Sequence, residues 1–150
     1  MEVSDIRSLP VLLLFLPLVA CGGGSPSAPT PQTPNVVGDY SGSTVINVPE
    51  LGQQITCPTT TKVTQSGTTV NIAPLVLGGQ CDNISIPLEQ VTIDNTGAIQ
   101  GQNSGSFDEE SCGRYTYTGS GGFFGREFRL SLNMTSSTCP NLNLTMTLSR

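Results

Sequence analysis

The C-terminal part of the chain alternates between apolar and polar side chains, which is the pattern of half-buried β-strands. One run covers residues 128–135 and the other covers residues 142–149. The apolar positions are Phe128, Leu130, Leu132 and Met134 in the first run and Leu142, Leu144, Met146 and Leu148 in the second. Successive side chains of a strand point to opposite faces, so each run predicts one buried face and one face in water. The segment TSSTCPN between them has the composition of a turn, and together they predict an antiparallel hairpin.

Short strand-like segments separated by turn residues continue upstream. The candidates are residues 38–48, 60–65, 69–77, 83–93, 98–107 and 115–118. Thr, Ser, Val, Ile and Asn are plentiful, whereas Ala, Glu and Lys are scarce, and this composition favours strands over helices. We therefore expect an all-β domain over residues 35–150, with about eight short strands in an antiparallel up-and-down barrel. The alternative is a two-sheet β-sandwich, and Leu88 and Val91 fall out of phase in a way that indicates a bulge or a break.

Four cysteines lie within this domain, and an even number in an exported chain predicts two disulfides. They are Cys57, Cys81, Cys112 and Cys139, each placed by the pattern at the start of an even-numbered strand, so that all four share one rim of the barrel. Bonds across the mouth would exceed the reach of a disulfide. Of the two pairings along the rim, we prefer Cys57 with Cys81 and Cys112 with Cys139 over Cys57 with Cys139 and Cys81 with Cys112. We expect no metal site, because the chain has no CxxC spacing and no histidine.

An apolar segment near the N-terminus has the properties of a secretory signal. Residues 11–20 read VLLLFLPLVA, which is too short to span a hydrocarbon core that needs about 20 residues. Leu18, Val19, Ala20 and Cys21 resemble the lipobox of bacterial lipoproteins. The resemblance implies that residues 1–20 are a signal peptide, and that a peptidase cleaves between Ala20 and Cys21.

The same resemblance implies a lipid anchor on Cys21. A diacylglycerol would be attached to its thiol and a fatty acid such as palmitate to its new amino group, which fixes the protein to membrane lipid without a membrane span. Gly22 stands where an aspartate would signal retention at the inner membrane, so the resemblance implies the outer membrane of a bacterial cell envelope. Residues 21–34 then form a lipidated cysteine and a Gly/Ser/Pro tether, whose composition favours an extended chain.

The two ends of the predicted barrel resemble those of lipocalins, the calycin class of small barrels. The first strand opens with GDYSGS at residues 38–43, in which Tyr40 stands where the lipocalin G-x-W motif has tryptophan. Arg150 ends the last strand, where lipocalins often place an arginine over that aromatic ring. The resemblance implies that Tyr40 and Arg150 point inward at one end of the barrel. The alternative is that Tyr40 is an ordinary core residue and Arg150 a frayed terminus.

Charge and chemistry argue against several classes of function. The formal net charge is -5 with six Lys and Arg residues, so we expect no nucleic-acid partner. Histidine is absent, and no nucleophile, zinc or phosphate-binding motif occurs, so we expect no enzyme, no catalytic residue and no cofactor. Asp108, Glu109 and Glu110 form the one carboxylate cluster. They could serve a hydrolase or a calcium loop, and the alternative that we prefer is a solvated loop tip.

Two functions fit the remaining pattern. A barrel of eight strands can hold one small apolar ligand, and we expect the ligand-lining residues to be Ile72, Ile86, Leu130, Leu144 and Met146. The alternative is a protein-interaction or hydrolase-inhibitor module of the cell envelope, with a filled core and active rim loops. An empty, dry cavity near 300 Å³ or more would favour the first, and a packed core with exposed apolar loop residues would favour the second.

Overall fold

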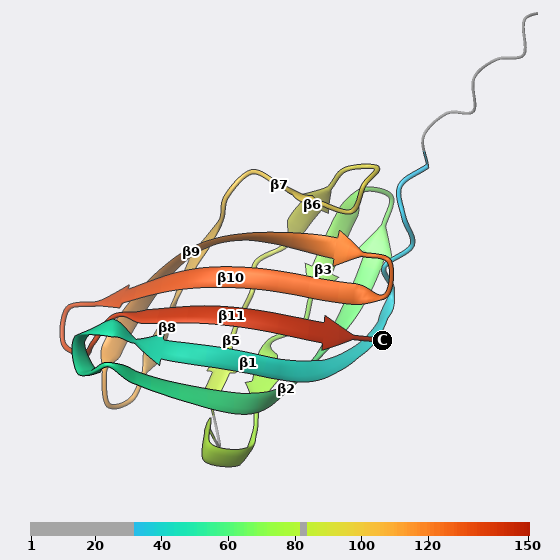
Figure 1. Cartoon of the computed structure of the whole chain (residues 1–150). Helices are drawn as coiled ribbons and strands as arrows, with labels where there is room; N and C mark the ends of the chain where they lie inside the picture. Colours follow the sequence, from blue (N-terminus) through green and yellow to red (C-terminus); the bar gives the residue numbers. More distant parts are fainter. Residues whose placement is uncertain (1–31, 82–83) are drawn as a thin grey trace, which may run out of the picture. The chain divides into compact units, whose positions relative to one another are not determined.

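The computed structural model describes residues 32–81 and 84–150, and the predicted signal peptide and lipobox lie outside them. The described residues form an antiparallel all-β unit, which confirms the predicted fold class (Figure 1). The strands are β1 (Gly38–Val48), β2 (Gln53–Ser66), β3 (Thr69–Ile72), β4 (Leu75–Leu77), β5 (Ile84–Ile86), β6 (Val91–Ile93), β7 (Ile99–Gln100), β8 (Asn103–Glu109), β9 (Gly113–Phe124), β10 (Glu127–Ser136) and β11 (Leu142–Ser149). Two 3-10 turns, η1 (Pro49–Leu51) and η2 (Gly79–Cys81), accompany them. Within the described residues, no helix is long and apolar enough to cross a membrane.

The strands follow the order β7-β6-β3-β2-β1-β11-β10-β9-β8 in one nearly closed sheet, with β4 paired to β2 and β5. This is the predicted up-and-down barrel. Three of the expected strands are each divided into two shorter strands, because a proline or a glycine interrupts the hydrogen bonding to the neighbouring strand. Pro74 separates β3 from β4 and Pro87 separates β5 from β6, since proline has no N–H to donate. Gly101, at a φ of 77°, separates β7 from β8.

The two ends of the barrel differ in how completely the sheet closes. At the end that contains the β9–β10 turn, which we call the closed end, β7 pairs with β6 and Ala98 bridges Gly122 of β9. The Phe123 N–H also donates to the Gly97 carbonyl at 2.8 Å. At the opposite end, the open end, η1, the β8–β9 turn and the β10–β11 loop form the rim. There β5 pairs only with β4 and β8 only with β9 among the described residues, which leaves a seam between β5 and β8.

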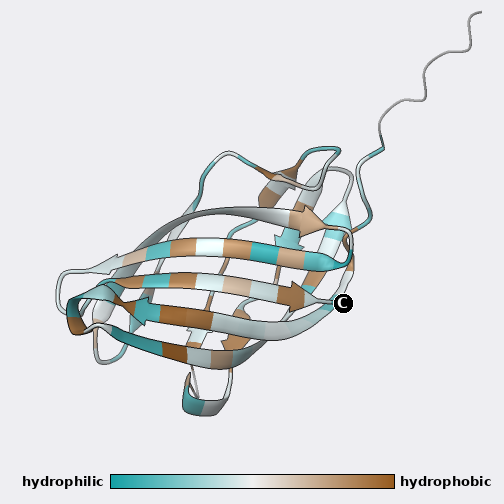
Figure 2. Cartoon of the chain, in the orientation of Figure 1, coloured by the Kyte–Doolittle hydropathy of each residue, from teal (hydrophilic) through white to brown (hydrophobic). Residues whose placement is uncertain are grey.

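The predicted alternation appears directly in the strands (Figure 2). In β10, Phe128, Leu130, Leu132 and Met134 are buried, while the residues between them are exposed on the outer face. The described residues form one compact unit whose hydrophobic core is the barrel interior. The period-two pattern therefore identified correctly which face of this strand the core occupies.

Three aromatic rings fill the closed end. Phe123 and Phe128 stack with their ring centroids 4.5 Å apart, and the Tyr40 ring meets both edge-on at 5.8 and 6.1 Å. The Tyr40 hydroxyl donates to the Val36 carbonyl at 3.0 Å. Tyr40 thus points inward, and burial raises its pKa above the ordinary value of 10.0.

Arg150 secures the chain where it enters the barrel at the closed end. Its guanidinium donates to the carbonyl oxygens of Val37 at 2.8 Å and Asn35 at 2.9 Å. Its positive charge acts to lower the pKa of Tyr40, against the larger effect of burial. The C-terminal arginine therefore binds the segment that leads into β1, so it is an ordered residue and not a frayed one.

Both disulfides have the preferred pairing. The Cα atoms of Cys57 and Cys81 are 5.9 Å apart, and those of Cys112 and Cys139 are 5.3 Å apart. The expectation that all four begin strands on one rim was wrong for Cys57. This residue lies inside β2, opposite Thr44, and its bond joins β2 to η2, which follows β4, a sheet neighbour of β2.

The reason for this error is the early start of β2. The strand begins at Gln53, and two of its inward positions are threonines, so apolar alternation does not reveal its first half. The buried Thr59 hydroxyl donates to the Thr44 hydroxyl at 2.7 Å, and the Thr61 hydroxyl donates to the Ala73 carbonyl at 2.7 Å. Paired hydroxyls can occupy a core at little cost, because each keeps a hydrogen bond.

Closure of the barrel makes Gly97 sensitive to substitution. Its φ is 88°, and an added Cβ would lie 2.0 Å from the Phe123 carbonyl oxygen. We expect Gly97→Ala to lower the free energy of unfolding by roughly 3 to 4 kcal/mol, the sum of backbone strain and overpacking. Gly101→Ala is the matched control, because its φ is 77° and nothing lies within 4 Å of an added Cβ. It should cost only about 1 to 2 kcal/mol. Urea titration measures both, and equal losses would contradict the expectation.

Candidate ligand cavity

An apolar cavity of about 270 Å³ lies at the open end of the barrel. It is lined by Ile46, Ile84, Ile86, Phe107, Glu109, Ser111, Cys112, Tyr115, Met134, Leu142 and Leu144. These residues come from β1, β5, β8, the β8–β9 turn, β9, β10 and β11, so the cavity draws on most of the barrel wall. It adjoins the seam, since β5 and β8 both contribute to it. We call it the end cavity.

The wall of the end cavity follows from alternation within each strand. Ile46 of β1, Met134 of β10 and Leu144 of β11 occupy inward positions, and Ile46 and Leu144 are direct partners in the sheet. Phe107 and Tyr115 face each other in register on β8 and β9, and their rings stack with centroids 5.7 Å apart. The side chains therefore form a continuous apolar lining, with an aromatic pair on the side of β8.

Tyr117 ties the two sides of the seam together beside the end cavity. It lies one inward position further along β9 than Tyr115, over Gly105, where an added Cβ would be 2.4 Å from its phenol oxygen. The hydroxyl donates to the carbonyl of Pro87 at 3.0 Å, so the ring links β9 to the β5–β6 connection. Burial raises the pKa of Tyr117 above its ordinary value of 10.0. The glycine at position 105 is what leaves room for the ring.

Polar groups gather where the end cavity meets the rim. The Tyr115 hydroxyl donates to the Pro140 carbonyl at 3.3 Å, and the tyrosine's pKa is raised by burial and then by the negative charges of Glu109 and Glu50. The Glu109 carboxylate accepts the backbone N–H groups of Ser111 at 2.9 Å and Cys112 at 2.7 Å. Glu109 therefore holds the β8–β9 turn and places a carboxylate at the cavity.

The five residues expected to line a ligand site divide into two groups. Ile86 and Leu144 line the end cavity. Ile72, Leu130 and Met146 are buried in the core but are not among its lining residues. The sequence interpretation missed Ile46, Phe107, Tyr115 and Met134, although each has an apolar side chain at an inward strand position. Alternation indicates that a residue faces the interior, but it cannot indicate which end of the interior is left unfilled.

The three carboxylates of residues 108–110 have different surroundings. Asp108 lies opposite Arg114 in the sheet, Glu109 holds the turn, and Glu110 is exposed. Over residues 32–81 and 84–150, no group of three or more histidine, cysteine, aspartate or glutamate side chains is arranged to hold a metal ion. The arrangement in this part of the chain is that of a structured turn.

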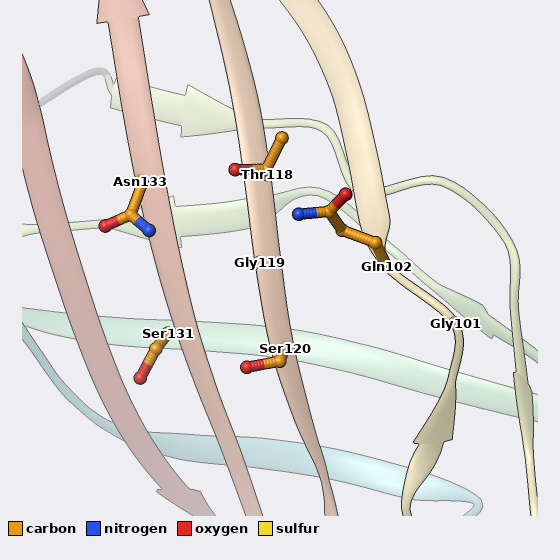
Figure 3. A pocket seen from close by; sticks show the side chains of 7 residues that line it. All are labelled: Gly101, Gln102, Thr118, Gly119, Ser120, Ser131 and Asn133. Atoms are coloured by element: carbon orange, nitrogen blue, oxygen red, sulfur yellow. The ribbon is translucent and has the colours of Figure 1, made fainter.

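A shallow polar depression of about 370 Å³ lies on the outer face of β9 and β10 (Figure 3). Its side chains are the hydroxyls and amides of Gln102, Thr118, Ser120, Ser131 and Asn133. Inside the barrel, Asn103 is only 4% exposed, and neither polar atom of its side chain has a hydrogen-bond partner among the described residues. These polar features are separate from the end cavity, with which they share no lining residue.

Acid should weaken the hydrogen bonds that the Glu50 and Asp94 carboxylates accept in η1 and in the β6–β7 turn. Hydrogen bonds from its own backbone and from Asn141 lower the pKa of Glu50 below its ordinary value of 4.5, and bonds from Thr96 lower that of Asp94 below 3.8. A carboxyl whose pKa is lower in the folded state stabilises the fold above its unfolded pKa, and this contribution is lost as the pH falls through the folded pKa. We therefore expect a lower urea midpoint at pH 3 than at pH 7. Glu50→Gln should reduce the difference, and an identical midpoint at both pH values would contradict the expectation.

Fold and cavity together define the class of this protein as a small antiparallel β-barrel with one end packed and an apolar cavity at the other. Comparison with protein-family models, curated proteins and solved structures found no match to the chain. The resemblance of its two ends to lipocalins therefore stays a prediction.

Proposed function

We propose that this protein is a lipid-anchored, non-catalytic barrel of the bacterial cell envelope that binds a small apolar molecule in its end cavity. The single observation that carries the proposal is the apolar lining of a 270 Å³ cavity beside an unpaired seam. Side chains normally fill the interior of a protein to the density of organic crystals, so a space of this volume with an apolar lining is unusual. The volume lies just below the range of about 300 to 1,000 Å³ that is usual for ligand pockets, so the ligand is small.

The sequence before the barrel supports an anchor at Cys21, and the chain enters the barrel at the end away from the cavity. The chain enters β1 at Gly38 in the closed end, where Arg150 holds it, whereas the end cavity lies at the open end. The described residues that lead into β1 therefore lie at the end of the barrel opposite the end cavity. The lipobox-like residues before Gly22 and the Gly/Ser/Pro composition that follows support the anchor, and Gly22 itself supports the outer membrane.

Filling the end cavity tests ligand binding. Leu144→Trp adds bulk at an inward position of the cavity, and Met134→Phe on β10 does so from another strand. Native mass spectrometry of protein purified from its own membrane should detect a retained small molecule, and both variants should lose it. Thr145→Trp is the matched control, because the neighbouring side chain on β11 is exposed. Retention of the molecule by both cavity variants, or its absence from the unaltered protein, would refute the proposal.

The anchor has a separate test. The mass of the N-terminal peptide of the mature protein should show acyl groups on Cys21, and Cys21→Ser should release the protein from the membrane fraction. An unmodified Cys21 in native material would refute the anchor and leave the proposed ligand site standing.

A second candidate is a protein-interaction module, such as an inhibitor of a hydrolase in the envelope. The observation that favours it is Leu51, which is 59% exposed at the tip of η1 on the open rim. Leu51→Ser should abolish the capture of such a partner if the rim is the contact surface, and it should leave the small-molecule content unchanged.

A further inference from the structure

The open end of the barrel carries an excess of negative charge around the end cavity. Glu50 lies on η1, and Asp108, Glu109 and Glu110 lie at the end of β8 and in its turn. The cation at this end is Arg114, which lies opposite Asp108 in the register of β8 and β9 and donates to the Ser106 hydroxyl at 3.0 Å. The described residues thus place four carboxylates and one guanidinium at this end.

The negative charge lies at the mouth of the end cavity, where the polar end of a bound ligand would be. Tyr115 lines the end cavity with its ring and lies at the rim with its hydroxyl, and the charges of Glu109 and Glu50 both raise its pKa. Two backbone N–H groups fix the Glu109 carboxylate through Oε2, while Oε1 has one long contact of 3.4 Å with the Ser111 hydroxyl. An acceptor oxygen with spare capacity therefore stands at the mouth.

The aromatic pair adds a second attraction for positive charge. The Phe107 and Tyr115 rings stack, and both line the end cavity. A ring face attracts an ammonium group within about 6 Å of its centroid. Carboxylates and ring faces at one mouth favour a cation and disfavour a carboxylate, which would meet like charge.

We infer that the ligand of the end cavity is an alkylammonium amphiphile, with its chain in the apolar lining and its protonated amine at Glu109 and the Phe107–Tyr115 pair. This inference rests on the proposed function, because it names the class of molecule that the same cavity binds. The volume equals roughly nine water molecules at about 30 Å³ each. Since a methylene group is of similar size, a chain of about nine or ten carbons fits.

Three probes with the same chain and different head groups test the inference. Decylammonium, 1-decanol and decanoate are titrated into the purified protein at pH 7 and low ionic strength, with Kd measured from NMR chemical-shift changes. Decylammonium should bind at least about tenfold more tightly than decanoate, with 1-decanol between them. The advantage should shrink with added salt, because the rim charges are exposed to solvent.

Charge variants connect the preference to the rim. Glu50→Gln combined with Glu109→Gln should reduce the ratio of the two Kd values to about threefold or less. The amide oxygen introduced at position 109 can still accept the turn N–H groups, and an unchanged Kd for uncharged 1-decanol reports that fold and cavity persist. Glu127→Gln, at the closed end, is the matched control and should leave the ratio unchanged.

The outcomes separate the two proposals. Decanoate binding as tightly as decylammonium would overturn the inference and leave the proposed function in place. Decylammonium binding that persists in Leu144→Trp would also overturn it, because the attraction would then be to the surface and not to the cavity. Failure of all three probes to bind would overturn the proposed function together with the inference.

Discussion

Replacing Cys57 and Cys81 together by alanine is expected to lower the free energy of unfolding by about 4 to 5 kcal/mol, measured by urea titration. The two residues are 24 apart in sequence, and closing a loop of that length removes roughly 3.5 kcal/mol of entropy from the unfolded chain. Cys57 is fully buried and Cys81 nearly so, and the loss of their sulfur atoms adds a cavity cost of about 1 kcal/mol. The free energy of unfolding of a native domain is only about 5 to 15 kcal/mol, so this loss is a large fraction of it.

The second disulfide provides the comparison. Cys112 and Cys139 are 27 residues apart, so the loop entropy is nearly equal, but both residues are only partly buried at the rim. Their double alanine variant should therefore cost about 3 to 4 kcal/mol. If the Cys112–Cys139 variant proves the more harmful of the two, or if neither variant alters the urea midpoint, the larger stabilising effect that we assign to the Cys57–Cys81 disulfide is wrong.

Phe128→Ala is expected to destabilise the barrel by about 3 to 5 kcal/mol. Phe128 is fully buried at the closed end, where it stacks on Phe123 and meets the edge of Tyr40. Removing the ring leaves a space that the neighbouring rings cannot fill, because β9 and β10 are held in register by the sheet. The loss is again measured as a change in the free energy of unfolding.

Phe124→Ala is the control with the same chemical change. Phe124 lies four residues before Phe128 across the β9–β10 turn, points outward and is 48% exposed. Its removal should cost less than about 1 kcal/mol, since a surface substitution away from the core usually has little effect. Similar losses in the two variants would mean that the closed end is not packed around Phe128.

In our proposal, the closed end of the barrel provides stability and the open end binds the ligand. Large rings fill the closed end and Arg150 secures the incoming chain there, whereas the open end keeps a cavity and an acidic rim. Leu144→Trp and the charge variants should therefore alter binding while Phe128→Ala alters stability. A domain of this size buries a limited area, so we expect its stability to depend strongly on the packed closed end.

Much of the fold could be predicted from the sequence because its signals are local. Strict alternation in residues 128–135 and 142–149 identified the last two strands and their buried faces, and turn residues divided the rest into six further segments. The order of those segments then restricted the disulfides to neighbouring strands, and the preferred pairing is the one observed. Each of these inferences depends only on residues close together in the chain, or on the simplest antiparallel connection between them.

The end cavity and its acidic mouth were decided by the tertiary structure. Pro87 divides one strand and Gly101 another, but whether the shortened pieces meet depends on how the whole sheet curves, and here β6 meets β7 while β5 and β8 stay apart. Inward residues such as Ile72 and Leu144 look alike in the sequence, yet the first is packed in the core and the second lines a cavity. Packing depends on the summed volumes of side chains from many strands at one level of the barrel, and that sum exists only once the strands are closed around it.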